Sequence, residues 1–485
     1  MTASTLAALL AGIDGVQLSG DAGVPITSLA IDSREVQPGA LFIALRGEHS
    51  DGHDYLEQAV RRGASALVVE ARAQVPGVDQ VAIARVPSTL AAVSRIAAAF
   101  YGEPSRALDV VGVTGTNGKT TTTILLAAIL GVAGRPCGII GTIGAHLGTR
   151  TWELANTTPL APQLHGLLAE MREGGARSVA MEVSSHALAL GRVEDVAFAV
   201  AAFTNLTRDH LDFHADVESY AAAKHHLLEL APACVLNRDD PYGKRWADEP
   251  ATTRRIVTYA LNESADLVAH GLKLTPDASR FVVDGQRYEL RLPGAFNVAN
   301  ALCAIACARL LGVDDAASAR GLASVEMVPG RMQRLEGAGI GVIIDYAHTP
   351  DALEHALDAL RATTGGRLLV VFGCGGDRDR GKRAEMGAVA ARLADRVYIT
   401  SDNPRSEDPQ VIVDEILVGL GTTPCVVELD RRLAIERAVS EAERADVVLV
   451  AGKGHERYQI VGDRIVAFDD VQIARQALAQ RCVPR

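Results

Sequence analysis

The sequence reads Leu108-Asp-Val-Val-Gly-Val-Thr-Gly-Thr-Asn-Gly-Lys-Thr-Thr-Thr-Thr123 at the point that decides the fold of its central part. A buried-strand pattern leads here into a glycine-lysine turn and then into an apolar helix, which we expect from Thr120 to Leu130. Gly115 and Gly118 let the backbone curl with its N–H groups pointing inward, and the helix start adds partial positive charge. The stretch therefore predicts a cradle for the phosphates of a nucleoside triphosphate, although Val113 stands where the strict phosphate-loop pattern has glycine.

Lys119 is expected to reach the outer phosphates, and the Thr120 hydroxyl is expected to bind the accompanying magnesium. Three other interpretations of this sequence differ in the motifs they need. A GTPase needs an Asn-Lys-x-Asp motif, and Asn237-Arg-Asp-Asp240 lacks the lysine. A nicotinamide fingerprint fails at Gly373-Cys-Gly-Gly-Asp-Arg378, because Arg378 replaces its third glycine. A glycine-rich turn that binds nothing is the remaining alternative.

Composition limits the class of protein. The 485 residues suggest about three domains, and 48% hydrophobic residues suffice for several cores. The net charge of -11, without an extended basic block, argues against a nucleic-acid or membrane-surface binder. Seven scattered cysteines without a Cys-x-x-Cys pair indicate reduced thiols and a cytoplasmic location, with Cys303 and Cys307 packed in a core. We expect a protein that is neither exported nor inserted in a membrane, since no leader or spanning segment stands out.

Strand and helix patterns divide the chain into three predicted α/β domains. Residues 1–103 contain short strands and a helix near residues 55–62, and they end in a Gly/Pro cluster. Residues 104–329 alternate β-branched runs with helices, which predicts a mainly parallel sheet around the phosphate loop. Residues 330–485 hold four more strand-loop-helix units after a second hinge, which predicts a Rossmann-like domain.

Polar clusters follow the ends of these predicted strands, where open α/β sheets bind their ligands. They are Glu182-Val-Ser-Ser-His186, Asn205 to His214, Asp345 to Pro350, Gly375 to Arg378, Asp402 to Arg405 and Gly452 to Glu456. Glu182 is the natural second carboxylate for a magnesium ion. The dense run of Asp209, His210, Asp212 and His214 also suits zinc, since two of its histidines lie four residues apart, or a purely structural role.

The chain resembles the Mur ligases over nearly its whole length. The resemblance is carried by motifs in the family's order: Thr114-Gly-Thr-Asn-Gly-Lys-Thr120, Met181 to His186, Thr204 to His214, Tyr220-Ala-Ala-Ala-Lys224, Phe296-Asn-Val-Ala-Asn300, Asp345-Tyr-Ala-His-Thr-Pro350 and Asp402-Asn-Pro-Arg405. It implies a monomeric cytoplasmic ligase of peptidoglycan precursor synthesis, and so of cell wall biogenesis, cell shape and division. The branch most resembled uses ATP and Mg²⁺ to add meso-2,6-diaminopimelate to UDP-N-acetylmuramoyl-L-alanyl-D-glutamate (UDP-MurNAc-L-Ala-D-Glu).

The resemblance also implies roles for individual residues. Those implied for ATP are Gly115, Thr116, Asn117, Gly118, Lys119, Thr120, Thr121, Asn297, Asn300, Arg331 and Asp345. Those implied for magnesium are Thr120, Glu182, His210 and Lys224, the last as a carbamate formed with CO2. Lys119, Glu182, His210 and Lys224 together are the implied catalytic residues.

Two further substrate sites are implied. The residues implied to bind the UDP-substrate are Ile31, Ser33, Glu48, His49, Ser50, Asn156, Thr157, Thr158, Ser184 and Arg192. The residues implied to bind diaminopimelate are Arg378, Asp402, Asn403, Pro404, Arg405, Gly452 and Glu456. Arg405 can fork two N–H bonds onto a carboxylate, and Glu456 matches an ammonium.

Three alternatives stay open. A lysine-adding ligase of the same family is disfavoured by Asp402 to Arg405, and a folylpolyglutamate-type ligase by Asp32-Ser-Arg34. A non-catalytic phosphate-loop regulator would need no carbamate lysine.

Overall fold

The computed structural model describes residues 4–47, 50–75, 80–249 and 254–481. Its described residues fall into two compact units. The first is Met1–Gly112, Arg135–Ala201 and His226–Pro232, and the second is Val113–Gly134, Ala202–His225 and Ala233–Arg485.

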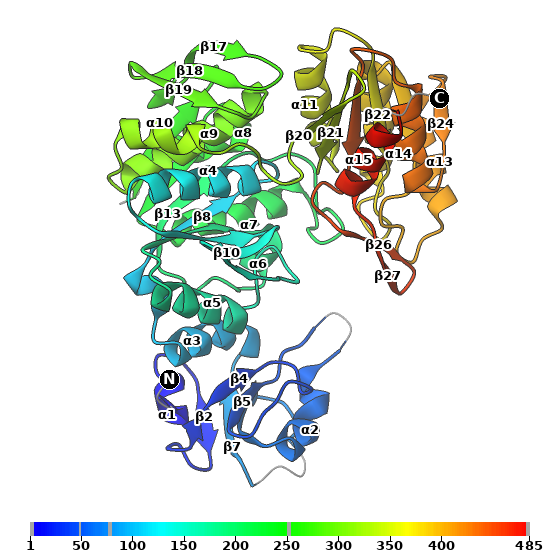
Figure 1. Ribbon diagram of the computed structural model, residues 1–485. Helices are drawn as coiled ribbons and strands as arrows, with labels where there is room; N and C mark the ends of the chain where they lie inside the picture. Colours follow the sequence, from blue (N-terminus) through cyan, green and yellow to red (C-terminus); the bar gives the residue numbers. More distant parts are fainter. Residues whose placement is uncertain (1–3, 48–49, 76–79, 250–253, 482–485) are drawn as a thin grey trace. The chain divides into compact units, whose positions relative to one another are not determined.

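The N-terminal sheet has the strand order β2-β7-β6-β5-β4, in which only β2 runs antiparallel to its neighbour (Figure 1). Along β6, Ala66 and Val68 enter one apolar cluster while Leu67 and Val69 enter the other. This alternation buries both faces of the sheet. The elements of this part are β1 (Ser4–Thr5), α1 (Leu6–Leu9), β2 (Gln17–Ser19), β3 (Pro25–Ile26), β4 (Ser28–Ala30), β5 (Ala40–Ile43), the 3-10 helix η1 (Gly52–Tyr55), α2 (Leu56–Arg61), β6 (Ala64–Glu70), β7 (Ala82–Val86) and α3 (Thr89–Phe100).

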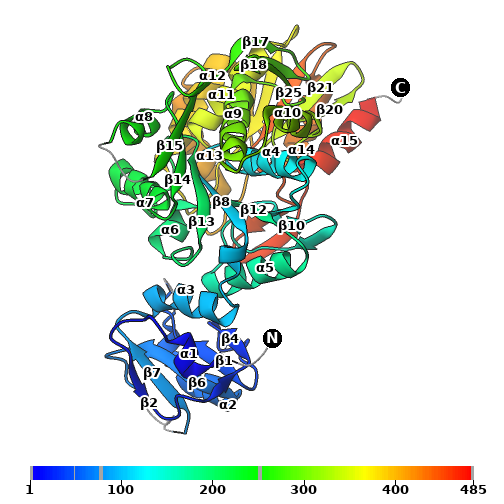
Figure 2. The same ribbon diagram turned by 90° about the vertical axis from the view of Figure 1, so that its left-hand side faces the viewer.

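The central part contains a nine-stranded sheet with the order β11-β10-β9-β12-β8-β13-β14-β15-β16 and a separate antiparallel sheet, β17-β18-β19. Helix α4, which follows the phosphate loop, packs beside α9 and α10 (Figure 2). Cys303 and Cys307 are fully buried in α9, so their predicted place in a core is confirmed. The elements are η2 (Pro104–Ala107), β8 (Asp109–Thr114), α4 (Lys119–Val132), β9 (Cys137–Gly141), β10 (Gly144–Leu147), β11 (Arg150–Trp152), α5 (Ala161–Glu173), β12 (Ser178–Glu182), α6 (Ser185–Ala189), β13 (Phe198–Phe203), α7 (Val217–Glu229), β14 (Ala233–Asn237), α8 (Pro241–Ala247), β15 (Arg255–Ala260), β16 (Leu267–Val268), β17 (His270–Leu274), β18 (Ser279–Val283), β19 (Gln286–Leu290), α9 (Ala295–Leu310) and α10 (Asp315–Ala323).

The C-terminal sheet has the order β20-β21-β25-β22-β23-β24, with β20 antiparallel and the other strands parallel (Figure 1). Helices α11, α12 and α13 cover one face, and α14 and α15 cover the other. The elements are β20 (Gln333–Gly337), β21 (Ile340–Asp345), α11 (Pro350–Arg361), β22 (Leu368–Phe372), α12 (Gly381–Leu393), β23 (Arg396–Ile399), α13 (Pro409–Leu420), β24 (Cys425–Val427), α14 (Arg431–Glu441), β25 (Val447–Ala451), β26 (Tyr458–Val461), β27 (Arg464–Ala467) and α15 (Asp470–Arg481).

The α/β class and the parallel-rich sheets predicted from the sequence are confirmed. Paired registers bring Asp345 opposite Ala451 and Phe372 opposite Ile399, so the polar loops after these strands share one edge of the C-terminal sheet. The helix expected at residues 55–62 is shorter than predicted, because Asp51 caps a 3-10 turn before it. No helix in the described ranges has the length and apolarity needed to cross a bilayer.

Helices α12 and α13 lie so close that glycine is required between them. A Cβ atom on Gly419 would collide with the backbone carbonyl of Ala384. Alanine normally stabilises a helix interior over glycine by up to about 1 kcal/mol, whereas overpacking costs about 1–3 kcal/mol. We therefore expect Gly419→Ala to lower the Tm measured by calorimetry.

Gly131 in α4 provides the matched control, because a Cβ atom there would have no heavy atom within 4 Å. Gly131→Ala should leave the Tm unchanged or raise it. A Gly419→Ala protein as stable as Gly131→Ala would show that the two helices can separate without cost.

Candidate active site

The phosphate loop is built from a buried strand, two glycines and a helix start. Strand β8 ends at Thr114 and α4 begins at Lys119. Gly115 has φ 146° and Gly118 has φ 87°, and a Cβ atom would collide with Thr204 Oγ1 at the first position and Asn300 Oδ1 at the second. Glycine is therefore needed at both positions, for conformation and for space.

Two lysine ammonium groups converge on this loop. Lys119 Nζ donates to the carbonyl oxygens of Gly115 at 2.8 Å and Thr116 at 2.9 Å. Lys224 Nζ, from α7, donates to the same Gly115 oxygen at 2.8 Å and lies 4.4 Å from the centre of the Tyr220 ring. Burial, and next the Lys119 charge, lowers the pKa of Lys224 well below its ordinary value. The loop thus places two lysine side chains where an anion would bind, and the fold disfavours the charged form of Lys224.

The run from Asp209 to His214 is spread over separate contacts. Asp209 is buried, with its Oδ2 atom 3.4 Å from His210 Nε2 and 3.8 Å from His348 Nε2. Asp212 faces Arg378 at 3.9 Å, whereas His214 packs against Tyr220. Within the described residues, no three His, Cys, Asp or Glu side chains gather as a metal cluster.

His210 has a φ of 54°, which is rare for a residue with a side chain. Its backbone N–H donates to Asp209 Oδ1 at 2.9 Å, so Asp209 holds this conformation. Burial opposes ionisation of Asp209, but His210 and other nearby positive groups keep its pKa below the usual range. The buried carboxylate is therefore charged and fixes the loop on which His210 lies.

A cavity of about 650 Å³ opens beside the phosphate loop in the second compact unit. Asn117, Gly118, Thr120, Thr121, Asn297, Asn300, Arg331 and Asp345 line it together with Tyr259 and Phe296. Arg331 donates from Nη2 to Thr120 Oγ1 at 3.1 Å and stacks on Tyr346, with its guanidinium carbon 4.5 Å from the ring centre. The structure thus brings most residues predicted to contact ATP into one cavity, with Gly115, Thr116 and Lys119 in the adjoining loop.

Glu182 and several residues predicted for the UDP-substrate lie in the first compact unit. The Glu182 carboxylate is 1% exposed and accepts from the backbone N–H and hydroxyl of Thr142 at 2.8 and 3.0 Å. Since Thr120, His210 and Lys224 belong to the second unit, the four-residue magnesium site remains a prediction.

Thr158 contacts two other residues that are predicted to bind the UDP-substrate in the central part of the chain. Its hydroxyl accepts from the Ser184 backbone N–H at 3.0 Å, and its carbonyl accepts from Arg192 Nη1 at 3.0 Å. Thr157 Oγ1 lies 3.2 Å from Thr142 Oγ1, and Asn156 is exposed.

In the N-terminal part, Ile31 follows β4, the buried Ser33 donates to Gln58 at 2.9 Å, and Ser50 is exposed. Glu48 and His49 lie outside the described residues.

The residues predicted for diaminopimelate gather at the carboxyl edge of the C-terminal sheet. Asn403 Nδ2 donates to Glu456 Oε2 at 3.0 Å, and Gly452 lies against Asp402. Burial and the Asp402 carboxylate raise the pKa of Glu456. Arg405 and Arg378 repel one another, since the Arg378 charge adds to burial in lowering the pKa of Arg405. The pocket therefore combines carboxylates and guanidinium groups.

Lys453 is a site residue that the sequence interpretation missed. Its ammonium is fully buried and lies 2.7 Å from Asn403 Oδ1, 3.3 Å from Asp402 Oδ1 and 3.4 Å from Glu456 Oε2. It also donates to the Tyr458 carbonyl at 2.8 Å. The sequence does place this lysine inside the polar run Gly452 to Glu456, which is a signal for a site residue. The residue types of that run do not, however, indicate that the ammonium is buried.

Fold and site define an α/β nucleotide-binding protein with a phosphate loop and a separate, charged pocket on a second parallel sheet. Three family models match the chain: "Mur ligase family, catalytic domain" over residues 25–101, "Mur ligase middle domain" over 113–308 and "Mur ligase, glutamate ligase domain" over 330–454. The chain belongs to the Mur ligase family.

Individual relatives are similar over almost their entire length. A UDP-N-acetylmuramoyl-L-alanyl-D-glutamate–2,6-diaminopimelate ligase of Gloeobacter violaceus is 46% identical over 470 residues, covering 94% of this chain and 95% of the relative. The ligase of the same name from Geobacillus thermodenitrificans is 43% identical over 492 residues, covering 98% and 99%. A solved structure of an enzyme of that name aligns with a TM-score of 0.69 at 31% identity and covers 100% of both chains.

The position of Lys453 between two carboxylates predicts a strong effect on stability. Lys453→Met would leave Asp402 and Glu456 buried without their cation, and breaking a buried pair in this way costs about 3–5 kcal/mol. We expect the free energy of unfolding, measured by chemical denaturation, to fall by several kcal/mol.

Adding Glu456→Gln to Lys453→Met should recover part of the loss, because it removes one of the stranded charges. Strictly additive costs of the two substitutions would contradict the ion-pair interpretation of Lys453.

Proposed function

We propose that this chain is an ATP-dependent amide ligase that joins meso-2,6-diaminopimelate to UDP-MurNAc-L-Ala-D-Glu in the cytoplasmic synthesis of peptidoglycan precursors. The observation that carries the proposal is the pocket formed by Asp402, Asn403, Arg405 and Glu456. Its opposite charges suit a substrate that ends in both an ammonium and a carboxylate. The relatives that share 40–46% identity with the chain and carry this enzyme's name support the same function.

ATP is proposed to occupy the 650 Å³ cavity, with its phosphates at Gly115 to Thr121 and its adenine near Asn297 and Asn300. The Thr120 hydroxyl, the Glu182 carboxylate and a carbamate on Lys224 are hard oxygen ligands, which is the chemistry that Mg²⁺ prefers; His210 would complete the set. When bound, magnesium offsets the negative charge of the transferring phosphoryl group.

The reaction begins with attack of the free D-glutamyl carboxylate on the γ-phosphorus of ATP, which gives an acyl phosphate and ADP. The free amine of diaminopimelate then attacks the acyl carbon. The tetrahedral intermediate collapses to the amide, inorganic phosphate and a proton. Lys119 and Arg331 supply positive charge beside the phosphates, while Glu456 and Arg405 orient the amine-bearing substrate.

The UDP-substrate is proposed to contact Ile31, Ser33 and Ser50 in the N-terminal part and Thr158, Ser184 and Arg192 in the central part. We further propose domain boundaries at residues 103/104 and 329/330. The gaps between the family-model matches support these positions, since one match ends at residue 101 and the next begins at 113, and that match ends at 308 and the last begins at 330. We also propose that the protein is a monomer.

The direct test is ADP release from the purified protein with UDP-MurNAc-L-Ala-D-Glu, comparing meso-diaminopimelate with L-lysine. Lysine lacks the distal carboxylate and would leave Arg405 unpaired, so kcat/KM should favour diaminopimelate by roughly a thousandfold. Equal use of the two amino acids, or a preference for lysine, would assign the chain to the lysine-adding alternative. ADP release independent of the UDP-substrate would overturn the ligase assignment.

Lys224 is proposed to act as a carbamate. A neutral amine is the form that reacts with CO2, and burial beside Lys119 favours that form. Carbamylation would also place a negative charge beside the Lys119 ammonium at the Gly115 carbonyl. Lys224→Ala should therefore lose roughly a hundredfold or more in kcat, and short carboxylic acids that fill the vacated space should restore part of it.

Lys244→Ala is the matched control, because Lys244 pairs with Glu263 at the surface. This variant should keep full activity. Protein equilibrated with ¹³C-bicarbonate should show a carbamate carbon signal by NMR that Lys224→Ala lacks. Full activity of Lys224→Ala in CO2-depleted buffer would contradict the carbamate.

A further inference from the structure

Two loops hold the guanidinium groups of the proposed amino-acid pocket. One follows β22 and contains Arg378, and the other follows β23 and contains Arg405. They are joined directly, since the Gly376 N–H donates to the Asn403 carbonyl at 2.9 Å and Arg405 Nη1 donates to the Gly376 carbonyl at 2.7 Å. The placement of either guanidinium therefore depends on both loops.

Each loop contains a residue in the left-handed backbone region. Asp377 has a φ of 52° and Arg405 has a φ of 51°. Arginine adopts this conformation only where its surroundings impose it, whereas aspartate tolerates it more readily because its short side chain hydrogen-bonds locally. The Asp377 carboxylate accepts from the Ser406 N–H at 3.1 Å and hydroxyl at 2.7 Å, so the two strained segments brace one another.

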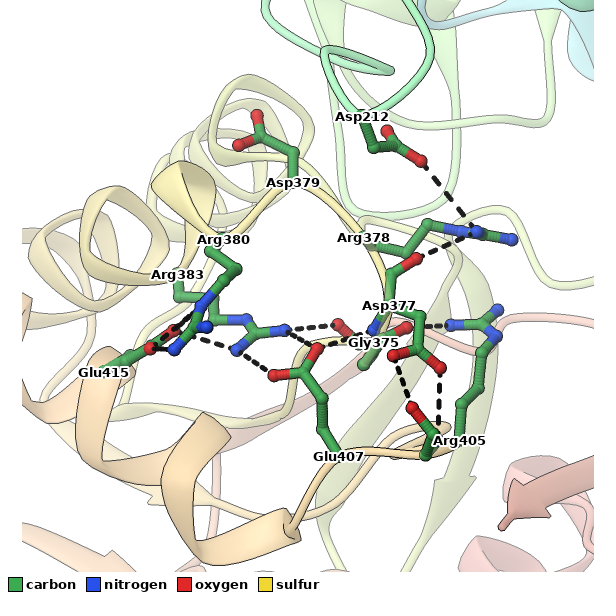
Figure 3. Close-up of polar contacts among 12 residues, drawn as sticks. Asp212, Gly375, Asp377, Arg378, Asp379, Arg380, Arg383, Arg405, Glu407 and Glu415 are labelled. Atoms are coloured by element: carbon green, nitrogen blue, oxygen red, sulfur yellow. Dashed lines mark hydrogen bonds and ion pairs between the residues drawn. The ribbon is translucent and has the colours of Figure 1, made fainter. Parts of the chain in front are cut away.

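Arg383 lies beneath both loops, near the start of α12, and is fully buried. Its guanidinium donates to the two Glu407 carboxylate oxygens at 2.8 and 2.9 Å and to the Gly375 carbonyl at 3.2 Å (Figure 3). A third carboxylate contact, to Glu415 in α13, measures 2.8 Å.

Glu407 connects Arg383 to Asp377 and Arg405, the two residues with left-handed backbone. It follows Arg405 by two positions in the same loop, and its Oε1 atom accepts from the Asp377 N–H at 2.6 Å. Hydrogen bonds from Arg383 keep the pKa of Glu407 at about 2. One buried guanidinium thus reaches both loops, directly through Gly375 and indirectly through a carboxylate that stays ionised.

We propose that Arg383, acting through Glu407, is a positioning residue that sets the spacing of Arg378 and Arg405 and thereby the selection of an amino acid with a distal carboxylate. The inference rests on the proposed function. A positioning role differs from that of a purely stabilising ion pair, because loss of the pair should weaken the binding of one substrate more than that of the others.

The experiment compares Glu407→Gln and Arg383→Lys with two reference variants. Arg405→Ala removes the proposed substrate contact itself. Arg380→Gln removes the neighbouring guanidinium that also pairs with Glu415 but whose side chain is 62% exposed. For each protein, KM and kcat are measured for diaminopimelate, ATP and the UDP-substrate, together with the ratio of kcat/KM for diaminopimelate to that for lysine.

Glu407→Gln should raise the KM for diaminopimelate roughly ten- to a hundredfold and lower its preference over lysine. The KM values for ATP and the UDP-substrate should stay within about twofold, because those substrates contact other residues. Arg383→Lys should have the same selective effect, because one ammonium cannot span Glu407 and Gly375 as a planar fork does. Arg380→Gln should match the wild type.

Equal losses for all three substrates, or a lower Tm with unchanged kinetics, would overturn the positioning role. Should Arg383→Lys fail to fold, Glu407→Gln decides alone, since it leaves the buried guanidinium its Glu415 and Gly375 partners. A wild-type protein without diaminopimelate-dependent ADP release would instead overturn the proposed function and this inference with it.

Discussion

The contact on which the site depends is the one between two lysine ammonium groups and the single carbonyl oxygen of Gly115. Each ammonium donates to it at 2.8 Å, one from the phosphate-loop helix and one from α7. Such close like charges are unfavourable unless an anion binds between them or one lysine loses its charge. Bound phosphates would place an anion between the two lysines, and a carbamate on Lys224 would remove the positive charge of that lysine. The proposed ligands would therefore relieve a charge repulsion that the fold creates at the phosphate loop.

Buried cations organise the C-terminal part in a similar way. Lys453 joins Asp402, Asn403 and Glu456, and Arg383 joins Glu407 to Gly375. Arg431 is a third case, because it pairs with Asp470 at 2.7 Å and donates to the Ala451 carbonyl at the end of β25. Each cation ties a loop at the carboxyl edge of the sheet to a second segment. A buried pair adds little net stability, but losing one partner is costly, so these pairs fix geometry.

The sequence predicted the fold well where local patterns agree with burial. Strands β12 (Ser178–Glu182) and β14 (Ala233–Asn237) belong to the mainly parallel sheet predicted for residues 104–329, because short apolar runs bounded by polar residues admit few other structures. The phosphate loop was equally clear, since Gly115 and Gly118 have a spacing that only a tight turn requires. The motifs of the family supplied the remaining residues predicted at the sites.

What the sequence could not predict are the contacts between distant loops. Arg383 reads as an ordinary helix residue in Gly381–Leu393, and Glu407 as part of an exposed turn. Their pairing across 24 positions depends on how the two strand-end loops fold over α12. The left-handed conformation of Arg405 is likewise imposed by its neighbours, against local preference, and has no signal in the residue type.

The two proposed catalytic regions of the second compact unit are themselves connected by charges. Arg208, from the loop that carries His210, pairs with Asp379 at 3.0 Å and Glu385 at 2.8 Å, and Asp212 from the same loop faces Arg378 at 3.9 Å. The Asp212–Arg378 pair is long and about half of the Arg378 side chain is exposed, so it contributes at most about 1 kcal/mol. A substrate carboxylate bound to Arg378 through two hydrogen bonds, as proposed above, would compete with Asp212 for this guanidinium. Arrival of the amino acid would then release one tether of the loop that holds His210, and the stronger Arg208 pairs would keep that loop in place.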